Sequence, residues 1–148
     1  MATAERQAHV LWEGSLIEGK GDVEFASSGI GRYPVTWASR VERPDGRTSP
    51  EELLAASHAA CYAMAFSHTL ATGGHPAERL QVTATVSLDA KPGGGFQVTG
   101  SALAVHGSVP GLDQAAFQQF ADQAEQGCPI SNALRGNLAI TVTATLES

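Results

Sequence analysis

Two cysteines are the residues of this sequence with the most distinctive chemistry. Cys61 lies in the apolar stretch SHAACYAM, and Cys128 lies in QGCPIS between a glycine and a proline. A thiolate is a nucleophile and a metal ligand, whereas a thiol buried in apolar surroundings is inert. The two residues could therefore be core side chains, zinc ligands or the two halves of a redox centre.

The surroundings of Cys61 contain two histidines at helical spacing. His58 precedes it by three residues and His68 follows it by seven, so both imidazoles fall near the same face of a helix. A protonated His58 would favour the nucleophilic thiolate. Alternatively, Cys61 is a small apolar residue of a buried helix, which is a common role of free cysteine.

Cys128 has the sequence context of a helix start. Gly127 lets the backbone turn, and Pro129 suits the first position of a helix. At that position the partial positive charge of the helix N-terminus would favour a thiolate. The alternative is a cysteine that lies at a helix junction by chance.

Other chemistries find less support in the sequence. His58, Cys61, His68 and Cys128 together would suit zinc, but the short paired spacings of zinc sites are absent. No Gly-x-Ser-x-Gly elbow of a serine hydrolase occurs. The runs GKG, GIG and GGG lack the spacing of a phosphate-binding loop. We therefore expect thiol chemistry with neither a metal nor another cofactor.

The helix that carries the first cysteine has clear start and stop signals. Ser49 can cap it, Pro50 suits its first position, and Glu52 completes a capping box. The glycine pair at 73–74 ends it. Apolar residues cover nearly all of its sides, so we expect this helix at the centre of the fold.

The remaining pattern predicts an α+β fold. The order of strands, helix, hairpin, helix and strand is typical of antiparallel sheets rather than of a doubly wound nucleotide-binding fold. Gly100 should mark a bulge, because the alternation of apolar residues changes phase there. Asp113 can cap a second helix over 111–126, and Pro129 can open a short helix that Gly136 closes. The expected strands are 10–12, 23–25, 33–41, 80–88, 96–109 and 138–146.

The composition bounds the class of protein. The chain has 148 residues, of which 43% are hydrophobic, and this fits a single globular domain over 1–148. Only 16% of the residues are charged, which hints that an oligomer covers part of the surface. A net charge of −6 with scattered basic residues argues against a nucleic-acid or membrane partner. Because no apolar leader or membrane-length run occurs, we expect a cytoplasmic protein, whose thiols are kept reduced.

Four segments resemble the OsmC/Ohr family of osmotically inducible and organic hydroperoxide resistance proteins, and most closely its OsmC branch. The resemblance extends from Trp12 to the C-terminus. Its most specific parts are Pro-Glu-Glu-Leu followed by His-Ala-Ala-Cys, and the later Gly-Cys-Pro. The four segments are SPEELLAASHAACYAMAFSHTL, VTATVSLDA, VPGLDQAAFQQFADQAEQGCPIS and LAITVTATLES.

The resemblance implies an antioxidant, thiol-dependent peroxidase of the osmotic and oxidative stress response. Such proteins reduce organic hydroperoxides, and hydrogen peroxide less well. They are intertwined homodimers whose antiparallel sheets wrap around central helices. The peroxidatic cysteine falls on Cys61 and the resolving cysteine on Cys128. The disulfide between them is reduced by a dithiol, for which lipoyl groups on partner proteins are the natural candidates.

The resemblance also implies an assisting arginine and glutamate. The glutamate matches Glu51 in Pro-Glu-Glu, and the arginine matches Arg40 in ASRVE. The alternatives for the arginine are its neighbours in the sequence, Arg32, Arg43 and Arg47. A guanidinium could hold the thiolate and polarise the peroxide, while the carboxylate orients it. Glu51 and Cys61 are ten residues apart, about 15 Å along a helix. Either a long arginine spans that distance, or the polar pair comes from the partner subunit of a dimer.

Two further expectations concern the surroundings of the thiols. Met64, Phe66 and Phe120 could line an entrance that prefers alkyl or lipid peroxides. His58 belongs to the matching His-Ala-Ala-Cys motif, which assigns it no role, whereas His68 lies outside the motif and is given no catalytic role. The alternative function is a non-enzymatic module that binds an apolar ligand or a protein partner and whose cysteines are inert.

Overall fold

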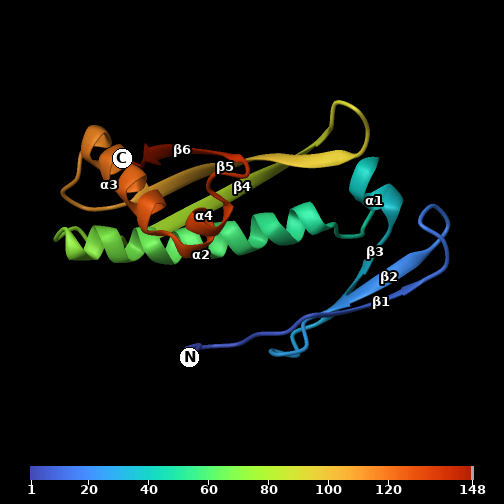
Figure 1. The fold of residues 1–148 in the computed structure, drawn as a ribbon. Coiled ribbons are helices and arrows are strands. Elements are labelled where there is room, and N and C mark those ends of the chain that lie inside the picture. The colour runs from blue at the N-terminus through green and yellow to red at the C-terminus, as the bar shows by residue number, and fades with distance from the viewer. Residues whose placement is uncertain (148) are drawn as a thin grey trace. The chain divides into compact units, whose positions relative to one another are not determined.

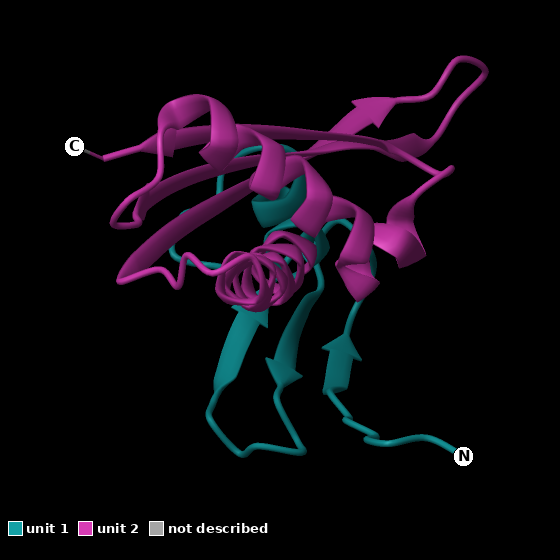
Figure 2. Cartoon of the chain, turned by 90° about the vertical axis from the view of Figure 1, so that its left-hand side faces the viewer, with its two compact units in different colours: residues 1–53 teal, residues 54–148 magenta. Residues whose placement is uncertain are grey.

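The computed structural model describes residues 1–147, so that Ser148, the last residue of the expected domain, lies outside the described residues. The described chain forms two compact units, residues 1–53 and residues 54–148 (Figure 2). Each unit is α+β, as the sequence pattern predicts. No helix within residues 1–147 combines the length and the apolar character that crossing a bilayer requires.

The first unit contains a small antiparallel sheet. Its strands are β1 (His9–Glu13), β2 (Lys20–Glu24) and β3 (Arg32–Val35), paired in the order β1-β2-β3. The first hairpin turns tightly at Gly19, where an added Cβ would lie 2.1 Å from the Ser15 carbonyl oxygen. Only glycine therefore fits this turn.

The expected third strand over 33–41 is wrong beyond Val35. The chain turns there into the short helix α1 (Trp37–Val41). The Thr36 hydroxyl accepts a bond from the Ser39 backbone N–H, and the Ser39 hydroxyl accepts one from the Thr36 backbone N–H, both at 3.0 Å. This reciprocal capping box starts the helix, and its Thr-x-x-Ser spacing is the signal that the strand interpretation overlooked.

The long helix α2 (Pro50–Thr72) has the predicted bounds. The Ser49 hydroxyl accepts a bond from the Glu52 backbone N–H at 3.1 Å. The Glu52 carboxylate instead accepts a bond from the Thr48 hydroxyl at 2.7 Å, so the predicted box is formed only in part. Gly74, with φ of 85°, follows the helix end.

The second unit contains a three-stranded mixed sheet of β4 (Arg79–Ala90), β5 (Phe96–Ser108) and β6 (Ala139–Leu146). β4 and β5 form the predicted hairpin, whereas β6 pairs with β5 in parallel. The expectation of purely antiparallel pairing is therefore wrong for β6. The chain crosses between β5 and β6 through two helices, and such a crossover returns it in the same direction.

The bulge of β5 lies next to the predicted position. Gly100 pairs with Ser87, and the next pair along the strands joins Leu88 to Val98. Thr99 is therefore the extra residue.

Helices α3 (Gln114–Gly127) and α4 (Pro129–Leu134) form the crossover. The Asp113 carboxylate caps α3, accepting a bond from the Ala116 backbone N–H at 2.8 Å. Helices α2 and α3 lie on the same face of the β4-β5-β6 sheet (Figure 1), and the core is between these layers. Its buried apolar residues are Tyr62, Phe66, Leu70, Leu103, Val105, Val109, Phe117, Ala121, Ala124, Cys128 and Ala144.

Helix α2 buries one face only. His58, Tyr62, Phe66 and Leu70, spaced by four residues, are all fully buried, as one stripe of a helix should be. On the other side the Met64 side chain is 69% exposed. The expectation of a helix covered nearly all round is therefore not met within a single chain.

Gly107 provides a test of the core packing. An added Cβ would lie 2.5 Å from Cζ of Phe117 and 3.0 Å from Cδ2 of Leu80. We expect Gly107→Ala to lower the free energy of unfolding by about 1–3 kcal/mol, because the buried ring must shift. At Gly100 in the same strand, an added Cβ meets only the Ala139 carbonyl oxygen at 3.4 Å.

Urea unfolding of both variants measures the difference. Gly100→Ala is the control and should change stability by less than about 0.5 kcal/mol. Equal effects of the two substitutions would contradict the described packing of Phe117.

Candidate functional site

The fold brings the two cysteines together. Cys61 lies in the middle of α2, and Cys128 is both the last cap of α3 and the first cap of α4. Both are free thiols, not joined by a disulfide, and Cys128 lies close enough to Cys61 to influence the pKa of its thiol. Cys61 is partly exposed, whereas Cys128 is fully buried. Cys61 is thus the more accessible of the two residues.

The surroundings of Cys61 in the second unit favour the protonated thiol. Burial raises its pKa above the ordinary value, and the neighbouring Cys128 side chain raises it further. The Ile130 backbone N–H of α4 donates to the Cys61 sulfur and lowers the pKa. On balance the pKa is raised, so a thiolate at Cys61 requires a further stabilising group.

His58 does not supply a positive charge that would stabilise a thiolate at Cys61. Its ring is fully buried between two hydroxyls, with Nδ1 2.6 Å from Ser101 Oγ and Nε2 2.7 Å from Ser131 Oγ. Burial lowers the pKa of His58, and the charge of Glu125 opposes this only in part, so the neutral ring is favoured. The idea that a protonated His58 activates Cys61 is therefore wrong.

The same geometry removes the support for a zinc site. Both ring nitrogens of His58 are engaged with serine hydroxyls. Across residues 1–147 no group of three or more His, Cys, Asp or Glu side chains is placed to hold a metal ion.

A buried carboxylate beside the thiols escaped the sequence analysis. Glu125, in α3, is 6% exposed, and its Oε1 lies 2.8 Å from Nη1 of Arg135. That contact is mainly electrostatic, because Oε1 receives no hydrogen bond of good geometry. Arg135 Nη2 also donates to the Glu125 carbonyl oxygen at 3.2 Å. Glu125 helps to raise the pKa of Tyr62, after the larger effects of burial, Asp122 and Cys128.

Arg40 and Glu51 meet in the first unit, as the resemblance implies. Arg40 donates from Nη2 to Oε1 of Glu51 at 2.8 Å and from Nε to the two carboxylate oxygens at 3.0 and 3.2 Å. This is a forked, charge-assisted pair. The Arg40 guanidinium also lies 6.0 Å from the ring centre of Trp37. The pair fixes the direction in which the guanidinium points.

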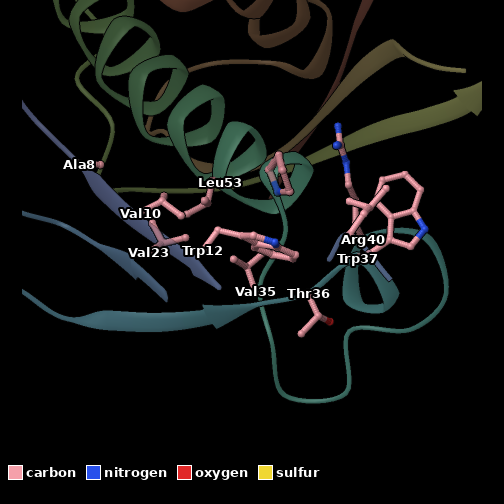
Figure 3. Close-up of a pocket in the computed structure, with 11 residues that line it drawn as sticks. Ala8, Val10, Trp12, Val23, Val35, Thr36, Trp37, Arg40 and Leu53 are labelled. Atoms are coloured by element: carbon pink, nitrogen blue, oxygen red, sulfur yellow. The ribbon is translucent and has the colours of Figure 1, made fainter. Parts of the chain in front are cut away.

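An apolar pocket of about 380 Å³ lies beside this guanidinium, within residues 1–53. Arg40 is the one charged residue of its lining. Figure 3 shows that apolar side chains of β1, β2 and the start of α2 point into a common space, while Arg40 and Trp37 lie together at one side. The lining comprises Ala8, Val10, Trp12, Leu16, Val23, Val35, Thr36, Trp37, Arg40, Pro50 and Leu53.

This pocket differs from the entrance that the sequence suggested. Phe66 is fully buried in the core, and Met64 is 69% exposed. Phe120 packs against the ring of His75, with the ring centres 6.1 Å apart. The lining of this pocket was not predicted because its residues are scattered over short strands, and their types alone do not distinguish pocket from core.

Comparison with known proteins places these features in a family. A sequence model of the OsmC-like protein family matches residues 43–143. The peroxiredoxin OsmC of Escherichia coli K12 is 40% identical over 138 residues, which cover 93% of this chain and 95% of that protein. The organic hydroperoxide resistance protein of Xanthomonas axonopodis pv. citri is 39% identical over 101 residues, 65% of this chain and 66% of that protein.

Solved structures agree with this assignment. A Legionella pneumophila structure described as an organic hydroperoxide resistance protein OsmC superposes with a TM-score of 0.76 at 30% identity, covering 97% of this chain and 99% of that chain. The organic hydroperoxide resistance protein OhrB of Bacillus subtilis gives a TM-score of 0.74 at 26% identity, with 94% and 98% coverage. The chain belongs to the OsmC-like protein family, and the resemblance seen in the sequence is confirmed.

The buried Glu125 gives a test of the charges around the thiols. Arg135→Met should lower the free energy of unfolding by about 1–3 kcal/mol, because a buried carboxylate loses its cation. Adding Glu125→Gln should restore part of that loss, since the amide carries no charge. Urea unfolding of the single and double variants provides the measurement.

The matched control is Arg32→Met. Arg32 pairs with Glu24 at 2.9 Å, but both side chains are well exposed. Its removal should cost less than about 0.5 kcal/mol. If the Arg135 and Arg32 variants are equally stable, Glu125 is not a buried charge that depends on Arg135.

Proposed function

We propose that this protein is a thiol-dependent peroxidase that reduces organic hydroperoxides to alcohols, and hydrogen peroxide less well. The observation that carries the proposal is that a partly exposed cysteine, Cys61, lies close to a fully buried one, Cys128. Relatives named peroxiredoxin and organic hydroperoxide resistance protein support it.

In the first step the Cys61 thiolate attacks one oxygen of the peroxide. The O–O bond breaks, the sulfur is oxidised to a sulfenic acid, and the departing alkoxide takes up a proton to give the alcohol. A thiolate is required because the neutral thiol is a poor nucleophile. The partial exposure of Cys61 gives the peroxide access to the sulfur.

In the second step Cys128 attacks the sulfur of the sulfenic acid. An S–S bond forms, the S–O bond breaks, and water leaves with the proton of the Cys128 thiol. The closeness of the two side chains supports this role, although the sulfurs must still approach each other before the bond can form. The disulfide protects Cys61 from irreversible oxidation.

Arg40 is the proposed cation of the site. The surroundings of Cys61 within residues 54–148 raise the pKa of its thiol, so the active thiolate needs a positive charge from elsewhere. A guanidinium stays charged at all relevant pH values and offers several donors. The pairing with Glu51 orients this group.

The pocket beside Arg40 supports an organic substrate. Its lining is mostly apolar, and Arg40 is its one charged residue. Such a site favours a molecule with an apolar body and one polar group. An alkyl or aryl hydroperoxide has this character, whereas hydrogen peroxide has no apolar part to bury. The pocket therefore supports a preference for organic hydroperoxides.

The proposal includes a dithiol reductant and a homodimer in the cytoplasm. A dithiol, such as a lipoyl group of a partner protein, would reduce the disulfide by thiol exchange and regenerate both thiols. Exposed apolar side chains of the single chain support a dimer, since a partner could cover them. Examples are Ile17 at 71%, Ile30 at 70% and Met64 at 69% exposure.

The decisive experiment follows both sulfurs after one equivalent of cumene hydroperoxide. The protein should form a Cys61–Cys128 disulfide and release one equivalent of alcohol, as measured by mass spectrometry and chromatography. Cys61→Ser should release no alcohol. Cys128→Ser should release alcohol once, then fail to recycle with a dithiol and accumulate sulfinic acid at Cys61. Should both thiols stay unmodified in the folded protein, the peroxidase function is lost.

Arg40 is tested through the pKa of Cys61. Arg40→Met should raise this pKa and slow peroxide reduction by about 100-fold, because the thiolate loses its cation. The pH profile of alkylation in a Cys128→Ser background reports the pKa, and the reactive form should appear only at higher pH. Arg43→Met is the matched control, because this neighbouring arginine is exposed. An unchanged pKa in the Arg40 variant would assign the cation to another residue.

A further inference from the structure

We propose that His58 is a positioning residue that holds α4, and with it Cys128 and the Ile130 N–H, against Cys61. This role rests on the proposed function, because it concerns formation of the Cys61–Cys128 disulfide. The mechanism above leaves His58 without a task, although the ring is fully buried and bonded at both nitrogens.

Two pairs of residues with the same spacing connect α2 to the start of α4. His58 and Cys61 are three residues apart on α2, and Cys128 and Ser131 are three residues apart at the start of α4. His58 contacts Ser131 at 2.7 Å, and Cys61 lies close to Cys128. Each pair spans about one helical turn, so the two contacts lie one turn apart. Fixing the first therefore restrains the second.

α4 needs such a restraint because it is very short. It has six residues, and its first cap, Cys128, makes no side-chain capping bond. A helix of this length does not hold itself in place. At its far end Arg135 donates to the Glu125 carbonyl oxygen at 3.2 Å. The buried bond between His58 and Ser131 is the contact that ties the middle of α4 to the helix carrying Cys61.

Ser101 fixes the ring from the other side. Its hydroxyl, on β5, is 2.6 Å from Nδ1 of His58 and is 1% exposed. A neutral imidazole has one donor and one acceptor nitrogen, while a hydroxyl can play either role. The two serines can therefore satisfy the ring in either tautomer. Burial lowers the pKa of His58, with Glu125 of α3 acting in the opposite direction, which keeps the ring in this neutral form.

The consequence for catalysis is twofold. α4 carries Cys128, which must reach the Cys61 sulfur, and Ile130, whose N–H lowers the pKa of Cys61. Loosening α4 should slow disulfide formation and also raise the pKa of Cys61. A purely stabilising histidine would affect neither quantity in a protein that remains folded.

Two substitutions of His58 separate the two bonds. His58→Gln places an amide near the position of Nε2 and can keep the bond to Ser131. His58→Asn places its amide near Nδ1 and can keep only the bond to Ser101. Both remove the ring and retain one buried hydrogen bond, so each is the control for the other.

The test is a single turnover of the full-length protein with one equivalent of cumene hydroperoxide. Rapid alkylation at successive times, followed by mass spectrometry, measures sulfenic acid and disulfide separately. We expect His58→Asn to form the disulfide about tenfold more slowly than His58→Gln, because the attacking sulfur is less well placed. The pKa of Cys61 should also be higher in the Asn variant. Equal rates and equal pKa values would overturn the positioning role.

A second pair covers the case in which a histidine variant does not fold. Ser131→Ala breaks the link to α4, and Ser101→Ala breaks the link to β5. Disulfide formation should slow by about tenfold in the first and by less than about threefold in the second. A Ser131 variant that forms the disulfide at the wild-type rate refutes the proposal. If the wild-type protein itself forms no Cys61–Cys128 disulfide, the proposed function fails. If the wild type forms the disulfide and the Ser131 variant forms it equally fast, only the positioning role of His58 fails.

Discussion

The closeness of the Cys61 and Cys128 side chains is the constraint on which the proposed chemistry of this protein depends. The two residues are far apart in the sequence and come from different helices. Their closeness follows from the packing of α2 and α3 on one face of the β4-β5-β6 sheet, which brings the junction of α3 and α4 against the middle of α2. The apolar core thus determines where the reactive groups meet.

That packing has an electrostatic consequence. The burial that brings the sulfurs together also raises the pKa of the Cys61 thiol and so disfavours the nucleophilic form. The second unit offsets this with a single neutral donor, the Ile130 N–H. A site that reacts through a thiolate must therefore add a full positive charge, and this requirement is the physical reason for assigning a role to Arg40.

The elements with strong local signals could be predicted from the sequence. The bounds of α2 followed from Pro50 and the glycine pair at 73–74, and the hairpin of β4 and β5 followed from alternation. Two of the wrong expectations about the fold have identifiable causes, which are a competing local signal in one case and a dependence on distant contacts in the other. The apolar residues of 33–41 suggested a strand although Thr36 and Ser39 start a helix. The parallel pairing of β6 is decided by the path of the crossover, which no local pattern records.

The residues of the candidate site also differ in whether the sequence could predict them. Cys61 and Cys128 were named from the chemistry of their residue type, and Arg40 and Glu51 were named from the family resemblance. The residues that surround the sulfurs were not, because a buried serine or glutamate is defined by its partners. Three such residues lie on three different elements, namely Ser101, Ser131 and Glu125. Their importance is visible only from their contacts, which are with His58 of α2 for the two serines and with Arg135 for the glutamate.

Burying these polar groups is costly unless each finds a partner. His58 between two serines is satisfied on both sides, and a satisfied polar network of this kind permits few alternative arrangements. Apolar side chains around the sulfurs would tolerate small shifts of α4, because hydrophobic contacts have little directionality. Hydrogen bonds would not tolerate such shifts, because their strength falls steeply when the distance or the angle departs from the optimum. Hydrogen bonds next to the thiols are therefore better suited than additional apolar contacts to hold the two sulfurs close to each other. In the proposed mechanism they would do this while the short helix α4 moves and the disulfide forms.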